Sequence, residues 1–152
     1  HPTTFMMVSS MQQVDFKNKK VLDMGCGTGV LGILACKLQA ADVLGIDIED
    51  WAVENAIKNA QTNHCKMKFE LGGKEKIPGT EYDVLLANIN RNILVDQKEL
   101  YNKSLKQGGV LLLSGFLEQD KEFVQKEFEN QGFSIINTYN KENWVCLVFQ
   151  KK

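Results

Sequence analysis

The sequence has few of the residues that metal-dependent and disulfide-bonded proteins need. Its 152 residues include two histidines, His1 and His64, and four cysteines that form no C-x-x-C pair. Zinc sites and small disulfide scaffolds require closely spaced residues of these types. We therefore expect no metal site, and we expect free cysteines in a reducing, cytoplasmic compartment.

Long apolar runs and an excess charge of one sign are missing as well. No apolar run in the sequence approaches the roughly 18 residues needed to span a bilayer, so no membrane contact is expected. The 18 Lys and Arg residues nearly cancel the 19 Asp and Glu residues, and Arg91 is the single arginine. Because no strong positive field is present, we expect no direct binding of nucleic acid.

The sequence does contain five short apolar runs separated by amphipathic stretches. Continuous runs of Val, Leu and Ile are typical of parallel strands that are covered on both faces. The stretches between them have helical patterns, and Gly108-Gly109 is expected to end the last one. This alternation predicts one doubly wound α/β domain over residues 1–152. The expected strands are VLDM (21–24), VLGIDI (43–48), MKFEL (67–71), YDVLLAN (82–88) and VLLLSG (110–115), and the expected helices between them span 30–39, 50–62 and 90–106.

The last part of the chain departs from this alternation. After a helix predicted at 119–131, FSIINTYN and NWVCLVFQ are separated by only Lys141 and Glu142. Parallel strands need a connection of about a dozen residues, so these two must form an antiparallel hairpin. The sequence thus predicts a seven-stranded sheet, with five parallel strands, a C-terminal antiparallel hairpin and helices on both faces. This Rossmann-like plan is typical of class I S-adenosylmethionine-dependent methyltransferases, whereas nicotinamide-dependent dehydrogenases usually complete six parallel strands.

The segment VLDMGCGTGVLG (21–32) contains two overlapping glycine motifs. From Gly27 it reads G-T-G-V-L-G, the dinucleotide fingerprint; from Asp23 it reads as an acid followed by three alternating glycines. The first register leaves Gly25 and Cys26 unexplained, whereas the second ends the strand at the acid and lets Gly25 and Gly27 adopt positive φ. A carboxylate at this strand end also suits the cationic side of S-adenosylmethionine. We favour the Asp23 register, with a nicotinamide dinucleotide as the alternative cofactor.

Two more polar residues stand where predicted strands end. Asp47 follows the glycines by about 20 residues, a position at which an acid accepts hydrogen bonds from ribose hydroxyls. Its alternative role is to cap the next helix, for which Asp50 is better placed. Asn88 ends the fourth strand, at the edge where open sheets bind ligands; its alternative role is to form a turn.

Six features of the sequence point to a known family: HPTTFMM, GCGTGVLGILACKLQA, GIDIEDWAVENA, YDVLLANINRNIL, LKQGGVLLLSGFL and the late Trp144. In order and spacing, they resemble the catalytic domain of the bacterial methyltransferases that modify large-subunit ribosomal protein eleven, the PrmA type. The resemblance implies that Thr4, Gly25, Asp47 and Asn88 contact S-adenosylmethionine. It also implies a separate substrate-recognition domain preceding His1 in a longer protein.

The substrates that this resemblance implies are lysine side chains and the N-terminal amine of the ribosomal protein. An amine attacks a methyl group only as the neutral base, and desolvation beside a sulfonium favours that form, so no dedicated base is expected. We expect Asn88 to orient the reacting groups. After Asn88 the family commonly reads I-L-A-N-P-L, whereas residues 89–94 here are INRNIL. A class I methyltransferase for a small molecule or RNA, and a non-catalytic S-adenosylmethionine-binding module, remain the alternatives.

Overall fold

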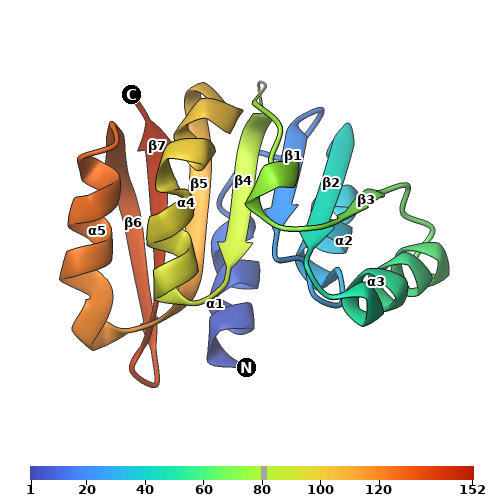
Figure 1. The fold of residues 1–152 in the computed structure, drawn as a ribbon, viewed down its shortest axis with the longest axis horizontal. Coiled ribbons are helices and arrows are strands. Elements are labelled where there is room, and N and C mark those ends of the chain that lie inside the picture. Colours follow the sequence, from blue (N-terminus) through green and yellow to red (C-terminus); the bar gives the residue numbers. More distant parts are fainter. Residues whose placement is uncertain (80–81) are drawn as a thin grey trace.

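A single seven-stranded sheet forms the centre of the molecule, as the computed structural model shows for residues 1–79 and 82–152 (Figure 1). The strands lie in the order β3-β2-β1-β4-β5-β7-β6. β1 to β5 pair in parallel, while β7 pairs antiparallel with both β5 and β6, which confirms the predicted fold. The strands span Lys20–Met24 (β1), Asp42–Asp47 (β2), Lys68–Leu71 (β3), Tyr82–Asn88 (β4), Leu105–Leu117 (β5), Phe133–Lys141 (β6) and Trp144–Lys151 (β7).

Helices cover both faces of the sheet. Figure 1 shows α4 (Arg91–Ser104) and α5 (Lys121–Glu129) in front of the sheet, and α1 (Pro2–Met11) and α2 (Val30–Lys37) behind it. α3 (Asp50–Thr62) packs against β2, β3 and α2. Two short 3-10 helices, η1 (Lys74–Lys76) and η2 (Glu118–Asp120), lie in connections. Within the described ranges, no helix is long and apolar enough to cross a membrane.

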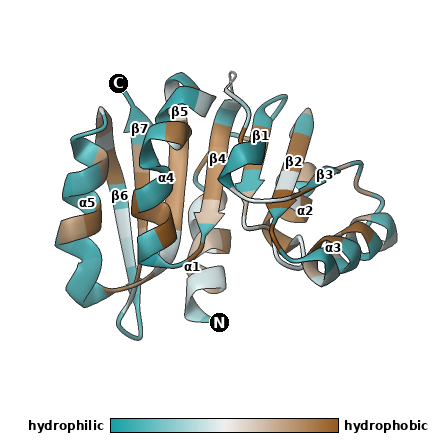
Figure 2. Cartoon of the chain, in the orientation of Figure 1, coloured by the Kyte–Doolittle hydropathy of each residue, from teal (hydrophilic) through white to brown (hydrophobic). Residues whose placement is uncertain are grey.

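Two apolar cores lie on the two faces of the sheet. Leu94, Tyr101 and Phe128 pack against one face from α4 and α5, while Met6 and Met7 of α1 pack against the other. Figure 2 shows β4 and β5 mostly brown between helices that carry teal residues on their outer sides. Burial on both faces therefore explains why these strands are continuous apolar runs instead of alternating ones.

The connections place a ligand-binding edge between β1 and β4. The chain runs from β1 outward to β2 and β3 and then returns to β4 on the other side of β1. Connections on the two sides of this point leave the sheet in opposite directions, which opens a crevice at the carboxyl ends of the two strands. The arrowheads of β1, β2 and β4 and the N-terminus of the chain lie at the same edge (Figure 1).

Two predictions about single elements are wrong. The first concerns β3, which the sequence predicts to be covered on both faces but which is mostly exposed. The second concerns the end of α4. Gly108 and Gly109 do not end the helix before β5, because α4 ends at Ser104 and β5 begins at Leu105. Both glycines lie inside β5, where the pairing with β4 changes register between Tyr82 and Val84. A Cβ atom at Gly109 would lie 2.8 Å from the carbonyl oxygen of Lys106, so this glycine permits a local irregularity of the strand.

Candidate functional site

A cavity of about 410 Å³ opens at the carboxyl ends of β1, β2 and β4. This volume lies in the range that small-molecule and cofactor sites occupy, and the cavity stands at the topological switch point of the sheet. Its lining includes the last residue of β1 and the one after it, the last residue of β2 and the one after it, the residue after β4, and one residue of α4: Met24, Gly25, Asp47, Ile48, Ile89 and Ile93.

The glycine loop after β1 forms one wall of the cavity. Gly25, Gly27 and Gly29 have φ angles of 69°, 54° and 84°, so all three adopt the left-handed conformation that favours glycine. The amides of Gly25 and Cys26 both donate to the carbonyl oxygen of Ile46, at 2.8 and 2.9 Å, which fixes the loop against β2. β1 ends at Met24, one residue beyond the acid Asp23 where the favoured register places the strand end, and Gly25 follows β1 directly.

Asp47 joins the end of β2 to the glycine loop. One carboxylate oxygen accepts a hydrogen bond from the amide of Gly27 at 2.8 Å, and the other accepts one from the amide of Glu49 at 3.0 Å. The second contact shapes the turn before α3, whereas Asp50 is the first residue of that helix and makes no capping bond. The expectation that Asp50 caps α3 is therefore wrong, and Asp47 organises two loops at the cavity wall.

Asp23 lies beneath the loop instead of on the cavity wall. It is only 1% exposed, and its carboxylate accepts a hydrogen bond from the amide of Gly32 in α2 at 3.1 Å. Burial raises the pKa of this carboxyl to about 7, against the opposing effect of the Gly32 hydrogen bond, and the charge of Asp47 raises the pKa further. A bound cation would favour the ionised form of Asp23 through the electric field without touching it.

The third glycine of the alternative register also has a structural role. A Cβ atom at Gly32 would lie 2.4 Å from Cε of Met67 and 3.1 Å from the Asp23 carboxylate. Gly32 therefore lets α2 pack closely over β1. Close packing of α2 explains why position 32 is a glycine. The match of Gly32 to the dinucleotide fingerprint is therefore no evidence that a dinucleotide binds.

Asn88 stands at the carboxyl end of β4, beside the cavity. It pairs with Ser114 of β5, and the next residue, Ile89, donates its amide to the carbonyl oxygen of Ser114 at 3.1 Å. Asn90 then caps α4 by accepting from the amide of Ile93 at 3.1 Å. Asn88 is not part of the cavity lining, and its predicted contact with a cofactor remains a prediction.

Thr4 lies in the first turn of α1. The N-terminus of the chain lies at the sheet edge where β1, β2 and β4 end (Figure 1). The Thr4 side chain is half-buried, and it is not part of the cavity lining. The neighbouring Thr3 is buried and donates its amide to Nδ1 of His1 at 3.2 Å. The predicted contact between Thr4 and a cofactor remains a prediction.

Sequence reasoning missed the apolar wall of the cavity. Ile48 is 73% exposed and Ile93 is 39% exposed, although both are large apolar side chains, and both line the cavity. Exposed apolar side chains inside a concave site suit the flat face of a nucleobase. For Ile48 the signal was present, because it directly follows Asp47 at the end of a strand.

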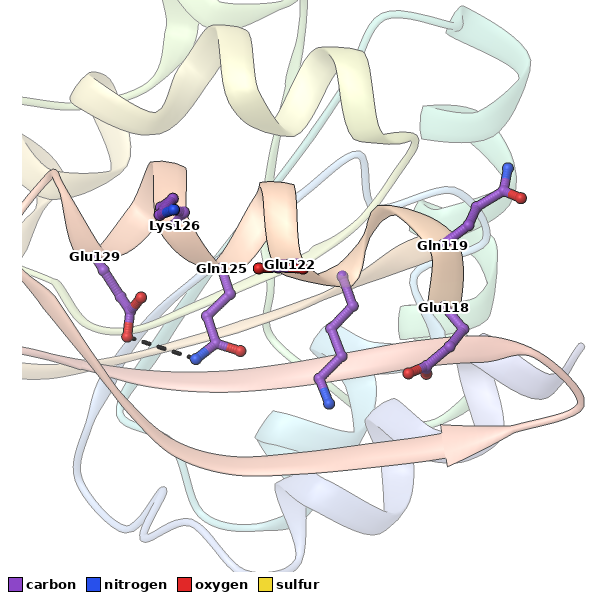
Figure 3. Close-up of a pocket in the computed structure, with 7 residues that line it drawn as sticks. Glu118, Gln119, Glu122, Gln125, Lys126 and Glu129 are labelled. Atoms are coloured by element: carbon purple, nitrogen blue, oxygen red, sulfur yellow. Dashed lines mark hydrogen bonds between the residues drawn. The ribbon is translucent and has the colours of Figure 1, made fainter.

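A larger hollow, of about 490 Å³, lies elsewhere along η2 and α5 (Figure 3). Its lining is polar and comes from residues of one helical segment, and Figure 3 shows a hydrogen bond between Gln125 and Glu129 along that segment. Convergent polar groups from different elements are absent from this lining, so we place the candidate site at the strand ends.

No cluster of three potential metal ligands occurs in residues 1–79 and 82–152.

Comparison with known proteins agrees with this geometry. The family model "Ribosomal protein L11 methyltransferase (PrmA)" matches residues 1–152. The chain is 40% identical over 151 residues to the ribosomal protein L11 methyltransferase of Porphyromonas gingivalis, covering 98% of this chain and 52% of that protein. It is 39% identical over 154 residues to the corresponding protein of Phocaeicola vulgatus, covering 100% of this chain and 55% of that protein. The chain thus spans about half the length of these relatives.

Solved structures show the same fold. A ribosomal protein L11 methylase from Lactobacillus delbrueckii subsp. bulgaricus superposes with a TM-score of 0.94 at 26% identity, covering 100% of this chain and 80% of that one. Magnesium protoporphyrin IX methyltransferase from Synechocystis PCC 6803, solved with bound SAM, shares the fold alone, with a TM-score of 0.80 at 19% identity, covering 99% of this chain and 78% of that one. From the match along its whole length, the chain belongs to the ribosomal protein L11 methyltransferase (PrmA) family.

Proposed function

We propose that this chain is the catalytic region of a methyltransferase that transfers methyl groups from S-adenosylmethionine to amines of ribosomal protein L11. The acceptor groups are lysine side chains and the N-terminal amine. Membership of the family and the names of the relatives support the substrate. The observation that carries the proposal is the cavity at the switch point, whose lining combines Gly25 and Asp47 with the apolar side chains of Ile48 and Ile93.

The cavity residues fit the adenosine half of this cofactor. Asp47 keeps unused lone pairs on both carboxylate oxygens, which can accept hydrogen bonds from the two ribose hydroxyls. Ile48 and Ile93 supply apolar surface for the adenine ring. Gly25 contacts the cofactor through its backbone, because the Ile89 side chain occupies the space where a Cβ atom would stand.

The other predicted residues act around the cationic half. Asp23 stabilises the positive charges from beneath the loop, while Gly27 holds the loop to Asp47. Thr4 contacts the cofactor from the first turn of α1. When bound, S-adenosylmethionine supplies an electrophilic methyl group on a sulfonium.

Asn88 is the residue that we assign to the transfer step. A lysine amine has an ordinary pKa of about 10.4, so it must lose a proton before its lone pair can attack. Desolvation at the sheet edge favours the neutral amine, and the Asn88 carbonyl can accept one of its hydrogens. Alignment of the amine nitrogen, the methyl carbon and the sulfur then provides most of the catalysis.

The proposal also includes a cytoplasmic location and no direct contact with nucleic acid.

Thermal unfolding with different ligands tests the cofactor. S-adenosylmethionine and its demethylated product at about 100 times their dissociation constants should each add roughly 2.7 kcal/mol of stability, and a nicotinamide dinucleotide should add none. Stabilisation by the dinucleotide alone would refute the cofactor assignment.

A methyl-transfer assay on the intact protein tests the acceptor. Mass spectrometry of L11 from the same organism should show added methyl groups on lysine or the N-terminal amine. Transfer to RNA or to small molecules, with L11 unchanged, would identify a different methyltransferase. Cofactor binding without transfer to any of these acceptors would identify a binding module.

A further inference from the structure

The segment after β4 is held between two glycines from different parts of the chain. A Cβ atom at Gly25 would lie 2.4 Å from Cγ2 of Ile89. A Cβ atom at Gly115 would lie 2.3 Å from the carbonyl oxygen of Ile89, 2.7 Å from its carbonyl carbon and 3.0 Å from its nitrogen. The side chain of Ile89 therefore packs against Gly25 of the glycine loop, and its backbone packs against Gly115 of β5.

Gly115 stands at an irregularity of β5. The pairing of β5 with β7 changes register between Ser114 and Phe116, and Gly115 has a φ angle of 105°. Such a bulge bends the strand locally. On one side of it Ser114 is fixed, because its hydroxyl donates to the carbonyl oxygen of Val145 at 2.7 Å. The bulge thus forms a rigid seat without a side chain, and the Ile89 peptide occupies this seat.

The same segment separates two hollows. Ile89 lines the candidate cofactor cavity, while Asn90, Arg91 and Gly115 line a second hollow of about 380 Å³ at the ends of β5 and β7. Asn88 is the last residue of β4 and directly precedes Ile89. Asn88 itself belongs to the lining of neither hollow. Because it is covalently joined to Ile89, the position of the Ile89 peptide influences the position of Asn88 beside the cavity.

We propose that Gly115 is a positioning residue for methyl transfer, which acts by seating the Ile89 peptide and thereby fixing Asn88. The inference rests on the proposed function. Transfer requires close in-line alignment, and a misplacement of about 1 Å can reduce a rate about 100-fold. Asp47 lies on β2, away from this seat, so cofactor affinity depends less on Gly115 than the rate does.

The first test compares Gly115→Ala with Gly108→Ala in the intact protein. Gly108 is a matched control, because it lies in the same strand with a φ angle of 82° and a Cβ atom there would meet nothing within 4 Å. We expect Gly115→Ala to lower kcat at least tenfold at saturating S-adenosylmethionine and L11, with the cofactor Kd changed less than threefold. Gly108→Ala should keep kcat within about twofold of the parent. Equal kcat values in the two variants would overturn the proposal.

A second pair of variants adds no atom to the seat and so avoids a clash. Ile89→Ala and Ile89→Gly lose the same contact with Gly25, but only the glycine frees the backbone. We expect a lower kcat for Ile89→Gly than for Ile89→Ala at equal cofactor saturation, and equal values would contradict the positioning role.

An inactive parent would count against the proposed function only. In that case crystal structures of the parent and Gly115→Ala decide, since unmoved residues 88–90 would overturn the inference and a displaced segment would support it.

Discussion

The carboxylate of Asp47 accepts a hydrogen bond from the backbone nitrogen of Gly27 at 2.8 Å, which ties the end of β2 to the loop after β1. The acid thus holds the cavity wall in shape before any ligand binds. Because the bond joins residues 20 positions apart, the loop and the acid act as one unit.

Replacement of Asp47 should therefore weaken cofactor binding. We expect Asp47→Ala to reduce the affinity for S-adenosylmethionine by about 1.5 to 3 kcal/mol, because charge-assisted hydrogen bonds are lost and the loop is loosened. Isothermal titration calorimetry measures this effect. Asp50→Ala is the matched control, since Asp50 is exposed and makes no capping bond. Equal affinities for parent and Asp47→Ala would refute the ribose role.

The buried carboxyl of Asp23 should make stability depend on pH. Its pKa is raised from 3.8 to about 7 by burial, so between these values the folded protein holds a proton that the unfolded chain has released. The stability from this proton is complete below about pH 4 and is lost as the pH rises through 7.

Asp23→Asn should remove this dependence, because asparagine still accepts the Gly32 hydrogen bond but does not titrate. Relative to the variant, the unfolding free energy of the parent should fall by up to about 4 kcal/mol from pH 4 to 8. Urea unfolding of both proteins at several pH values provides the difference. A difference that is constant with pH would show that Asp23 is ionised throughout.

Gly25 and Ile89 should be energetically coupled. Gly25→Ala places a methyl group against the Ile89 side chain, and we expect a loss of about tenfold in cofactor affinity. The double variant Gly25→Ala/Ile89→Ala relieves the clash, so a double-mutant cycle should show a coupling above about 0.5 kcal/mol. Gly27→Ala has positive φ but meets no atom, and Ile89→Ala should not rescue it. Additive effects of the Gly25 and Ile89 changes would contradict the contact.

Two fully buried serines should respond to alanine in opposite ways. The hydroxyl of Ser104 has no hydrogen-bond partner among residues 1–79 and 82–152, whereas that of Ser114 donates to Val145. We expect Ser104→Ala to raise the unfolding free energy by up to about 1 kcal/mol and Ser114→Ala to lower it by about 1 kcal/mol. Chemical denaturation measures both. Destabilisation by Ser104→Ala would reveal a partner for that hydroxyl.

The sequence alone determined the architecture of the sheet. Strands that are buried on both faces are mostly apolar, so VLDM and YDVLLAN can be recognised without knowledge of their neighbours. The short link between the last two strands excludes a crossover, because two residues cannot carry the chain across a sheet. The positive φ of Gly25 and Gly27 was also predictable, since the preference is a property of the residue itself.

Local patterns failed where two or more equivalent signals competed. Gly108 and Gly109 carry the same helix-ending signal as any glycine pair, but Ser104 is the last helical residue because β5 begins at Leu105 to pair with β4. Asp50 is a residue type that often caps helices, yet Asp47 makes the hydrogen bond in the turn before α3. Its position at the end of β2 places its carboxylate next to the amide of Glu49.

Only the tertiary structure decided how the candidate site is assembled. The burial of Asp23 depends on α2 packing over β1 at Gly32, and the seat of Ile89 depends on Gly115 in a strand more than 20 residues away. Such contacts join residues that are distant in the chain, so motif spacing in the sequence cannot predict them. The residues at the strand ends could be identified from the sequence, because the start and end of a strand follow from the local pattern of residues. Long-range packing decided which of these residues line the cavity and which are buried beneath it.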